Sequence, residues 1–291
     1  MFDAPGTKGM TDYPMGKAGT YDDLGPAARS ALHSILFQPK VDLSTKRYCG
    51  VEALSRWQPD QTQPPWLQTR GGVSVPDTDE HCQAYDYVVL SSVLNLCGRW
   101  SPALRSKAGT VSVNITGPTL SSAWLAPFIK RCLSTRGLPR LTIELTETFA
   151  ITNETSALKT MQTLSRYGVA FSIDDFLTGF NQQPIFARLP FEELKVDRQD
   201  VQNLSTKRGS ALVAQIVSSA KARGATVVAE GIENPAQLEL AKASGCAQGQ
   251  GFCISQPLTE SDFVNRLAQP GDHPWAATEF EHAQKEKTQQ L

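Results

Sequence analysis

Short runs of β-branched and other apolar residues alternate along the chain with longer segments of helical period. The short runs predict eight strands, at residues 35–43, 48–57, 110–115, 141–146, 169–174, 193–197, 226–230 and 249–254. The longer segments predict helices at residues 85–99, 120–135, 156–167, 210–223, 235–244 and 260–267. Strands that alternate with helices are typical of parallel strands joined by crossover helices.

Residue types at the ends of several helices support these boundaries. Asn153 or Thr155 can cap the helix at 156–167, and Gly168 follows that helix. Gly224 follows the helix at 210–223, and Pro235 stands in the first turn of the next one. The chain therefore carries start and stop signals where the periodicity changes.

Eight strands in a core of about 240 residues predict an α/β fold of the (β/α)8, TIM-like type. The first two strands are separated only by Ser44–Arg47. Four residues are too few for a crossover helix, so we expect these two strands to be antiparallel and the barrel to be a modified one. A doubly wound open sheet is the alternative. We expect the barrel at residues 29–270, between an N-terminal tail at 1–28 and a C-terminal tail at 271–291.

Composition narrows the classes of function. The 28 Lys and Arg residues balance 29 Asp and Glu residues, a formal charge of -1, which argues against binding of bulk nucleic acid. No apolar run approaches the roughly 18 residues that a membrane helix needs, so we expect no membrane contact. The six cysteines form no C-x-x-C pair, which favours free thiols in a reducing compartment. We therefore expect the protein in the cytoplasm.

Acidic and amide residues interrupt the apolar strands near their carboxyl ends. They are Glu52, Asn114, Glu144, Asp174 with Asp175, Glu230 and Gln250, and Lys195 stands at an equivalent position. A barrel gathers the carboxyl ends of its strands around one mouth, so we expect these residues to converge there. Several carboxylates around one mouth would repel each other unless cations lay between them.

The ligand types indicate which cation. None of the four histidines stands at a strand end, so a zinc site of imidazole or thiolate ligands is not expected. Carboxylates with the Asn114 amide suit Mg²⁺ or Mn²⁺. Two such ions can clamp a phosphate for in-line attack, and Lys195 could orient the attacking hydroxide or offset charge in the transition state. This pattern predicts a phosphodiesterase.

Each of these residues also has a plain structural interpretation. A glutamate at a strand end is often a solvated rim residue or a helix cap. Lys195 and Asp197 could form an ion pair on one face of their strand, and Asp174 with Asp175 could begin an Asx-turn. The pattern alone leaves these interpretations open.

Seven motifs in the same order resemble the EAL-domain family of cyclic di-GMP phosphodiesterases. The first is Glu52-Ala53-Leu54-Ser55-Arg56, and the others are Val113-Asn114-Ile115, Glu144-Leu145-Thr146-Glu147, Asp174-Asp175-Phe176, Lys195-Val196-Asp197, Ala229-Glu230-Gly231-Ile232-Glu233 and Gln250-Gly251-Phe252. The resemblance implies a barrel whose first strand is antiparallel. It also implies metal-dependent hydrolysis of cyclic di-GMP to the linear dinucleotide 5'-pGpG, by a homodimer.

The resemblance assigns roles to individual residues. It implies that one Mg²⁺ or Mn²⁺ binds Glu52, Asn114, Glu144 and Asp174, and that a second binds Asp174, Asp175 and Glu230. Glu52, Lys195 and Glu230 would be catalytic, with Lys195 on the attacking water. Arg56, Leu54, Asp197 and Gln250 would contact the substrate, Arg56 as a two-pronged phosphate donor. Glu147 and Glu233 would support the ligands from behind, Glu147 by anchoring the loop after Asp175.

Two departures from the family pattern bear on activity. Leu177 replaces a glycine in the loop after Asp175, and the segment at residues 58–80 is rich in Pro and Gln where the family is more apolar. If the loop needs positive φ at Leu177, a side chain there costs about 1 kcal/mol or more.

Two rival functions follow from the same residues. One is a catalytically weak or inactive EAL-like protein that binds cyclic di-GMP or docks on another protein, and it would need no metal for affinity. The other is a metal-dependent barrel enzyme that acts on a small carbon acid, with Lys195 as general base.

Overall fold

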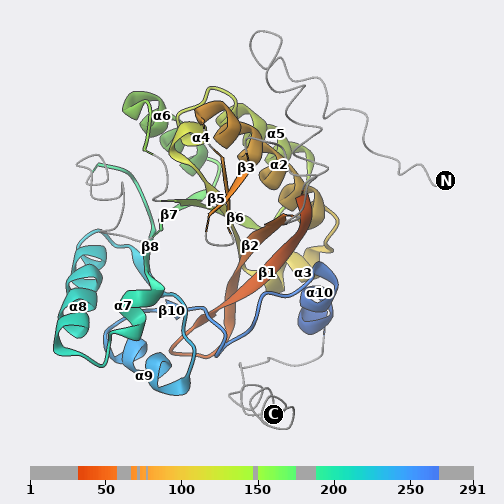
Figure 1. The fold of residues 1–291 in the computed structure, drawn as a ribbon. Coiled ribbons are helices and arrows are strands. Elements are labelled where there is room, and N and C mark those ends of the chain that lie inside the picture. The colour runs from red at the N-terminus through yellow and green to blue at the C-terminus, as the bar shows by residue number, and fades with distance from the viewer. Residues whose placement is uncertain are drawn as a thin grey trace.

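The computed structural model describes residues 32–57, 67–70, 73–76, 78–146, 150–174 and 188–268. Eight strands close into a barrel in the order β1-β10-β9-β8-β7-β6-β5-β2 (Figure 1). They are β1 (Leu32–Asp42), β2 (Tyr48–Trp57), β5 (Thr110–Ile115), β6 (Arg140–Leu145), β7 (Ala170–Ile173), β8 (Glu193–Val196), β9 (Thr226–Ala229) and β10 (Gln248–Gly249). The predicted barrel is confirmed, and the open-sheet alternative is wrong.

The first strand runs against its two neighbours. β1 pairs antiparallel with both β2 and β10, whereas the six other neighbouring pairs of the barrel are parallel. The turn between β1 and β2 is held by Asp42, whose carboxylate accepts hydrogen bonds from the backbone N–H groups of Ser44 and Thr45 at 2.9 and 2.7 Å. The antiparallel first strand expected from this short connection is therefore confirmed.

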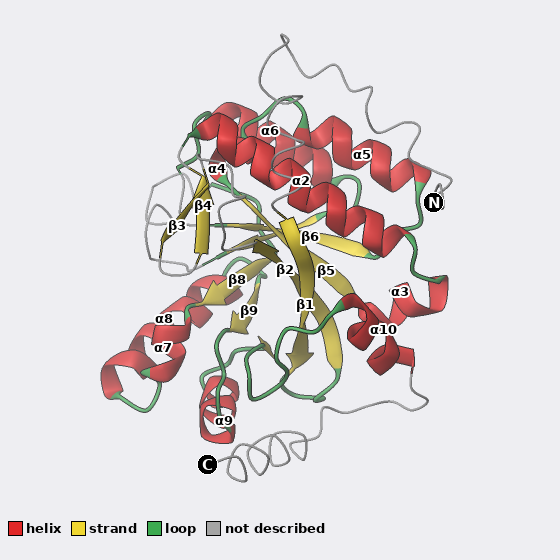
Figure 2. Ribbon diagram, turned by 45° about the vertical axis from the view of Figure 1, so that its right-hand side comes forward, coloured by secondary structure: helices red, strands yellow, loops and turns green. Residues whose placement is uncertain are grey.

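Helices cover the outside of the barrel. They are α2 (Asp79–Gly98), α3 (Pro102–Ala108), α4 (Gly117–Leu120), α5 (Leu125–Thr135), α6 (Glu154–Ser165), α7 (Arg198–Gln202), α8 (Lys207–Lys221), α9 (Pro235–Ala243) and α10 (Glu260–Ala268). Figure 2 shows α2, α5 and α6 together on one side of the barrel and α7, α8 and α9 on another. The six predicted helices are present, but α3, α4, α7 and the hairpin of β3 (Leu67–Arg70) and β4 (Val73–Pro76) were not predicted from the sequence.

Local capping chemistry explains several helix ends. The Asn153 side chain accepts a hydrogen bond from the Ser156 N–H at 2.9 Å, as expected for the residue that caps α6. Gly168 follows that helix with φ of 79°, a conformation that costs glycine little. α2 begins at Asp79, six residues before its predicted start, because Thr78 caps it by accepting from the His81 N–H.

The last strand is shorter than predicted. β10 ends at Gly249, whereas the pattern predicted a strand over 249–254. Two residues after the strand, at Gly251, a Cβ atom would lie only 2.2 Å from the backbone nitrogen of Ile232. This close approach requires glycine, and it brings the segment after Gln250 against the one that follows β9.

Alternation along the strands sends two kinds of residue to the two faces of the barrel wall. On β5, Val111, Val113 and Ile115 are buried in the apolar core. Ser112 and Asn114 alternate with them, and the register pairs Ser112 with Glu52 and Asn114 with Glu144. Paired residues of neighbouring parallel strands share a face, so the polar residues face the barrel interior and the apolar ones pack beneath the helices.

A buried aspartate fixes the chain just after Asn114. Asp86 of α2 accepts hydrogen bonds from the N–H and the hydroxyl of Thr116, at 2.8 and 2.7 Å. Burial raises the pKa of Asp86 to about 6, and the hydrogen bonds from Thr119 and Thr116 counteract that rise. The outer helix layer is therefore tied to the mouth end of β5.

The cysteines bear out the expectation of free thiols. All six are free, and five of them are buried, with Cys49 partly so. Among the residues that the structure describes, no helix is long and apolar enough to cross a membrane.

Candidate active site

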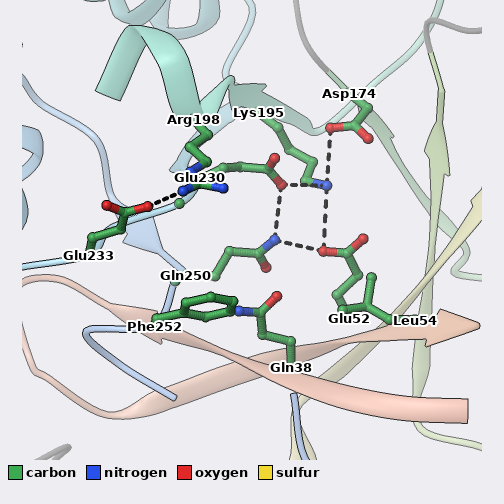
Figure 3. A pocket seen from close by; sticks show the side chains of 12 residues that line it. Gln38, Glu52, Leu54, Asp174, Lys195, Arg198, Glu230, Glu233, Gln250 and Phe252 are labelled. Carbon is green, nitrogen blue, oxygen red and sulfur yellow. Dashed lines mark hydrogen bonds and ion pairs between the residues drawn. The ribbon is translucent and has the colours of Figure 1, made fainter. Parts of the chain in front are cut away.

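The side chains predicted to converge do so around one ammonium group. Lys195 projects from β8 into the barrel mouth and is 1% exposed. Its Nζ lies 2.6 Å from Glu230, 2.7 Å from Glu144, 3.1 Å from Asp174 and 3.6 Å from Glu52. Figure 3 shows three of these carboxylates, those of Glu52, Asp174 and Glu230, around the lysine.

Two amide side chains complete this cluster. Asn114 donates a hydrogen bond from Nδ2 to Glu52 at 2.8 Å. Gln250 donates from Nε2 to Glu52 at 2.6 Å and to Glu230 at 2.9 Å. Residues from β2, β5 and the segments after β9 and β10 are therefore joined in one hydrogen-bonded network across the mouth.

The carboxylates do not share one electrostatic environment. Burial raises the pKa of Glu52, and Lys195 opposes that rise. Burial likewise raises the pKa of Glu230 well above its usual range. Burial acts in the same sense on Glu144, but Lys195 and Lys40 outweigh it and hold the pKa of Glu144 well below its usual range. Of these three glutamates, Glu144 is therefore the one whose ionised form is favoured.

Lys195 is held as a cation. Burial lowers the pKa of this side chain, but Asp174, Glu144, Glu230 and Glu52 outweigh burial and raise it well above its ordinary value. A lysine that keeps its proton is a poor general base, which argues against the carbon-acid enzyme. Its ion pairs are with these four carboxylates, whereas Asp197 caps α7 by accepting from the Gln199 N–H at 2.6 Å.

Two buried lysines lie among the carboxylates and reduce the repulsion between them. Lys195 and Lys40 supply counter-charge for the buried carboxylates. As these side chains stand, the carboxylates are turned toward the Lys195 ammonium. In this arrangement no three His, Cys, Asp or Glu side chains of the described ranges are spaced to hold a metal ion.

Two buried oxygen atoms nevertheless fit a hard cation. Asn114 Oδ1 and Gln250 Oε1 have no hydrogen-bond partner among the described residues, although both are buried. A buried carbonyl oxygen without a partner is costly, and a divalent ion would satisfy it. With the neighbouring carboxylates these atoms form an all-oxygen donor set, the type that Mg²⁺ and Mn²⁺ prefer.

A cavity of about 270 Å³ opens at this network. Its lining includes the four mouth residues Glu52, Asp174, Lys195 and Glu230, and a rim that comprises Gln38, Leu54, Arg198, Gly231, Glu233, Gln250, Gly251 and Phe252. Ligand sites usually measure about 300 to 1,000 Å³, so a ligand of ordinary size would extend beyond the rim onto the open surface.

The remaining predicted site residues lie at different places. Leu54 lines the cavity, whereas Arg56 is exposed and donates to the Ser55 carbonyl oxygen at 3.0 Å. Glu233 lies on the cavity rim, paired with Arg198 (Figure 3). Asp175, Glu147 and Leu177 lie outside the described residues, as do the predicted tails and most of the segment at 58–80.

Four residues of this region were not predicted from the sequence. Gln38 and Lys40 of β1 face the barrel interior, and Arg198 and Phe252 line the cavity rim, Phe252 with 57% of its surface exposed. Gln38 and Lys40 alternate with Phe37, Pro39 and Val41 in the sequence. This period of two was the available signal that both side chains share one face of the strand. No comparable pattern marks Arg198.

Fold and site together define a closed β/α barrel with one antiparallel strand and an acidic mouth arranged around a buried lysine. The chain belongs to the EAL domain family, whose family model matches residues 24–257. The prediction of this family from seven short motifs is therefore confirmed.

Individual relatives agree with this assignment. The oxygen sensor protein DosP of Escherichia coli K12 is 31% identical over 253 residues, which cover 81% of this chain and 30% of DosP. An uncharacterised protein of Synechocystis is 28% identical over 81% of this chain and 34% of its own length. The chain thus spans about a third of the length of these two curated relatives.

Solved structures share the fold. The PaMucR phosphodiesterase, solved as a c-di-GMP complex, is 27% identical with a TM-score of 0.64, over 79% of this chain and 98% of that one. The EAL domain of Mycobacterium smegmatis DcpA is 24% identical with a TM-score of 0.67, over 82% of this chain and 96% of that one.

Proposed function

We propose that this protein hydrolyses one phosphodiester of cyclic di-GMP to linear 5'-pGpG, with two Mg²⁺ or Mn²⁺ ions. The observation that carries the proposal is the convergence of Glu52, Glu144, Asp174 and Glu230 with Lys195 in one barrel mouth. Membership of the EAL family and the likeness to a phosphodiesterase solved with c-di-GMP support the choice of substrate.

The proposed metal ligands are those that the family resemblance implies. In this proposal one ion binds Glu52, Asn114, Glu144 and Asp174, and the other binds Asp174, Asp175 and Glu230. The unpartnered Asn114 oxygen fits this arrangement. When bound, such ions make a hydroxide available near neutral pH and offset the negative charge of the phosphate.

The chain's own residues divide the remaining work. The Lys195 ammonium, already held by carboxylates, donates a hydrogen bond to the attacking oxygen and offsets charge on the phosphorus centre. The water oxygen bonds to phosphorus and the bond from phosphorus to the 3' oxygen breaks. The proton that the attacking water loses is balanced by the one that the released 3' oxygen gains, so that this oxygen leaves as a hydroxyl group. Gln250 steadies the water or the substrate. Leu54 contacts the dinucleotide within the cavity lining, and Arg56 and Asp197 contact it as well.

Product analysis tests this proposal. The purified full chain, incubated with cyclic di-GMP and Mn²⁺, should convert it to 5'-pGpG, and EDTA should abolish conversion. Chromatography of the nucleotides measures both. Tight binding of cyclic di-GMP without any linear product, at millimolar Mn²⁺ or Mg²⁺, would contradict the proposed enzymatic activity.

One observation favours the receptor as the second candidate. The two buried lysines supply counter-charge for the carboxylates without any metal, and a receptor that binds its ligand without metal needs such compensation. The two candidates differ in one property. A receptor keeps its affinity for cyclic di-GMP in EDTA and forms no product.

The proposed catalytic unit comprises residues 29–270, between tails at 1–28 and 271–291. The proposal also includes a homodimer in the cytoplasm. The family resemblance favours the dimer, and six free cysteines favour a reducing compartment.

A further inference from the structure

A second buried lysine lies deeper in the barrel than the mouth. Lys40 of β1 is fully buried, and its Nζ donates to Ser112 at 2.7 Å, to Glu144 at 2.8 Å and to Glu193 at 3.1 Å. It therefore ties the antiparallel strand to β5, β6 and β8. The proposed reaction does not itself use this side chain.

The two oxygens of Glu144 are held by different lysines. Lys40 contacts Oε1, and Lys195 contacts Oε2 from the side of the mouth. Oε2 is thus the Glu144 oxygen directed at the cluster around Lys195. With Lys40 in place, the carboxylate cannot rotate without losing a buried ion pair.

Lys40 has a second acidic partner. Glu193 of β8 is 9% exposed and forms an ion pair with the Lys40 ammonium. A row of alternating charges therefore runs inward from Glu230 through Lys195, Glu144 and Lys40 to Glu193, with successive contacts of 2.6, 2.7, 2.8 and 3.1 Å.

We propose that Lys40 is a positioning residue, which fixes Glu144 so that Oε2 alone is presented to a metal ion. This inference rests on the proposed function. Residues that orient a ligand in this way are worth about 10- to 100-fold in metal affinity. Lys40 itself contacts neither metal nor substrate in this arrangement. Its effect therefore appears in metal binding measured without substrate.

Titration calorimetry with Mn²⁺ on the full chain, without nucleotide, tests the proposal. Lys40→Met should weaken Mn²⁺ binding about 10- to 100-fold. Because this variant leaves Glu193 without its partner and can fail to fold, the double variant Lys40→Met/Glu193→Gln provides the second test, with the same loss expected. Glu193→Gln alone should leave the affinity within about threefold of wild type, because Lys40 keeps its contact with Glu144.

Two buried serines provide a further test variant and its matched control. The Ser112 hydroxyl accepts a hydrogen bond from Lys40, whereas the Ser172 hydroxyl, on the paired strand next to Glu144, has no partner among the described residues. Ser112→Ala should weaken Mn²⁺ binding a few-fold, and Ser172→Ala should not. Folding of each variant is checked by circular dichroism.

The outcomes separate this inference from the proposed function. Unchanged or tighter Mn²⁺ binding by both Lys40 variants overturns the positioning role, and tighter binding would mean that the Lys40 charge acts only by repelling the ion. If the wild type binds Mn²⁺ but forms no 5'-pGpG, the proposed phosphodiesterase activity is wrong, while the effect of Lys40 on Mn²⁺ binding is still measured. If the wild type binds no Mn²⁺, both the proposed activity and the positioning role are wrong.

Discussion

Glu52→Gln is expected to lower turnover of cyclic di-GMP by about 10³-fold or more while the protein remains folded. The substitution keeps the size of the side chain but removes the negative charge proposed to bind a metal ion. Glu52 is buried, and burial already raises its pKa, so a neutral group at this position is not costly to the fold. Steady-state rates and thermal melts of the purified variant measure the two effects.

Glu260→Gln is the matched control for this variant. Glu260 accepts a hydrogen bond from Trp100 at 3.0 Å and belongs to α10, outside the barrel mouth. Its loss should leave turnover near that of the wild type. Global unfolding of Glu52→Gln, or turnover equal to that of the control, would contradict the proposed role of Glu52 as a metal ligand.

Lys195→Met is expected to affect both stability and turnover. Four carboxylates lie within 3.6 Å of this ammonium, and removing one partner of a buried ion pair costs about 3 kcal/mol or more. We expect that loss for the metal-free protein at neutral pH. Turnover should fall about 10²- to 10³-fold, because the donor to the attacking oxygen is lost.

The pH and metal dependence of this variant distinguish charge loss from a packing defect. Without the ammonium the carboxylates hold protons more tightly, so protonation relieves their repulsion and the stability gap to the wild type should narrow as pH falls. Mn²⁺ should raise the melting temperature of Lys195→Met more than that of the wild type, because the ion replaces the missing charge. Lys242→Met, an exposed substitution on α9, should show neither effect.

An equal gap at every pH, with no extra stabilisation by Mn²⁺, would count against an electrostatic role. Such a result would assign Lys195 to packing alone. Urea unfolding of both proteins in EDTA, repeated across the acid range, gives the required free energies.

Much of the fold follows from the sequence because each barrel strand places its apolar residues under the helices. Val111, Val113 and Ile115 illustrate this, and their period of two predicted β5 at its observed bounds. The antiparallel first strand followed from a connection too short for a helix. By contrast, the length of β10 depended on a tertiary contact of Gly251 with Ile232, which no local pattern reveals.

The candidate site was predicted in part. The carboxyl ends of the strands identified the mouth residues, because strand ends converge in any such barrel. Part of the counter-charge was not predicted: Lys195 was expected at the mouth, whereas only the structure shows that the Lys40 side chain points inward and pairs with Glu144. Arg198 and Phe252 line the cavity because α7 and the segment after β10 pass beside it. The positions of these two segments depend on tertiary packing.

The buried lysines also allow several carboxylates to lie close together in the mouth. Lys195 and Lys40 offset part of the negative charge of Glu52, Glu144 and Asp174. In the proposed mechanism, carboxylates that bound a metal ion would share their oxygens between it and the Lys195 ammonium. Lys195 would then have a hydrogen to donate to the attacking water.

Anomalous diffraction at the manganese edge, from crystals of the full chain grown with Mn²⁺, tests the central claim most directly. We predict an anomalous peak in the barrel mouth, about 2 Å from oxygens of Glu52, Asn114, Glu144 and Asp174. Crystals at millimolar Mn²⁺ in which the mouth shows no peak, and Lys195 still holds all four carboxylates, would contradict the proposed metal site.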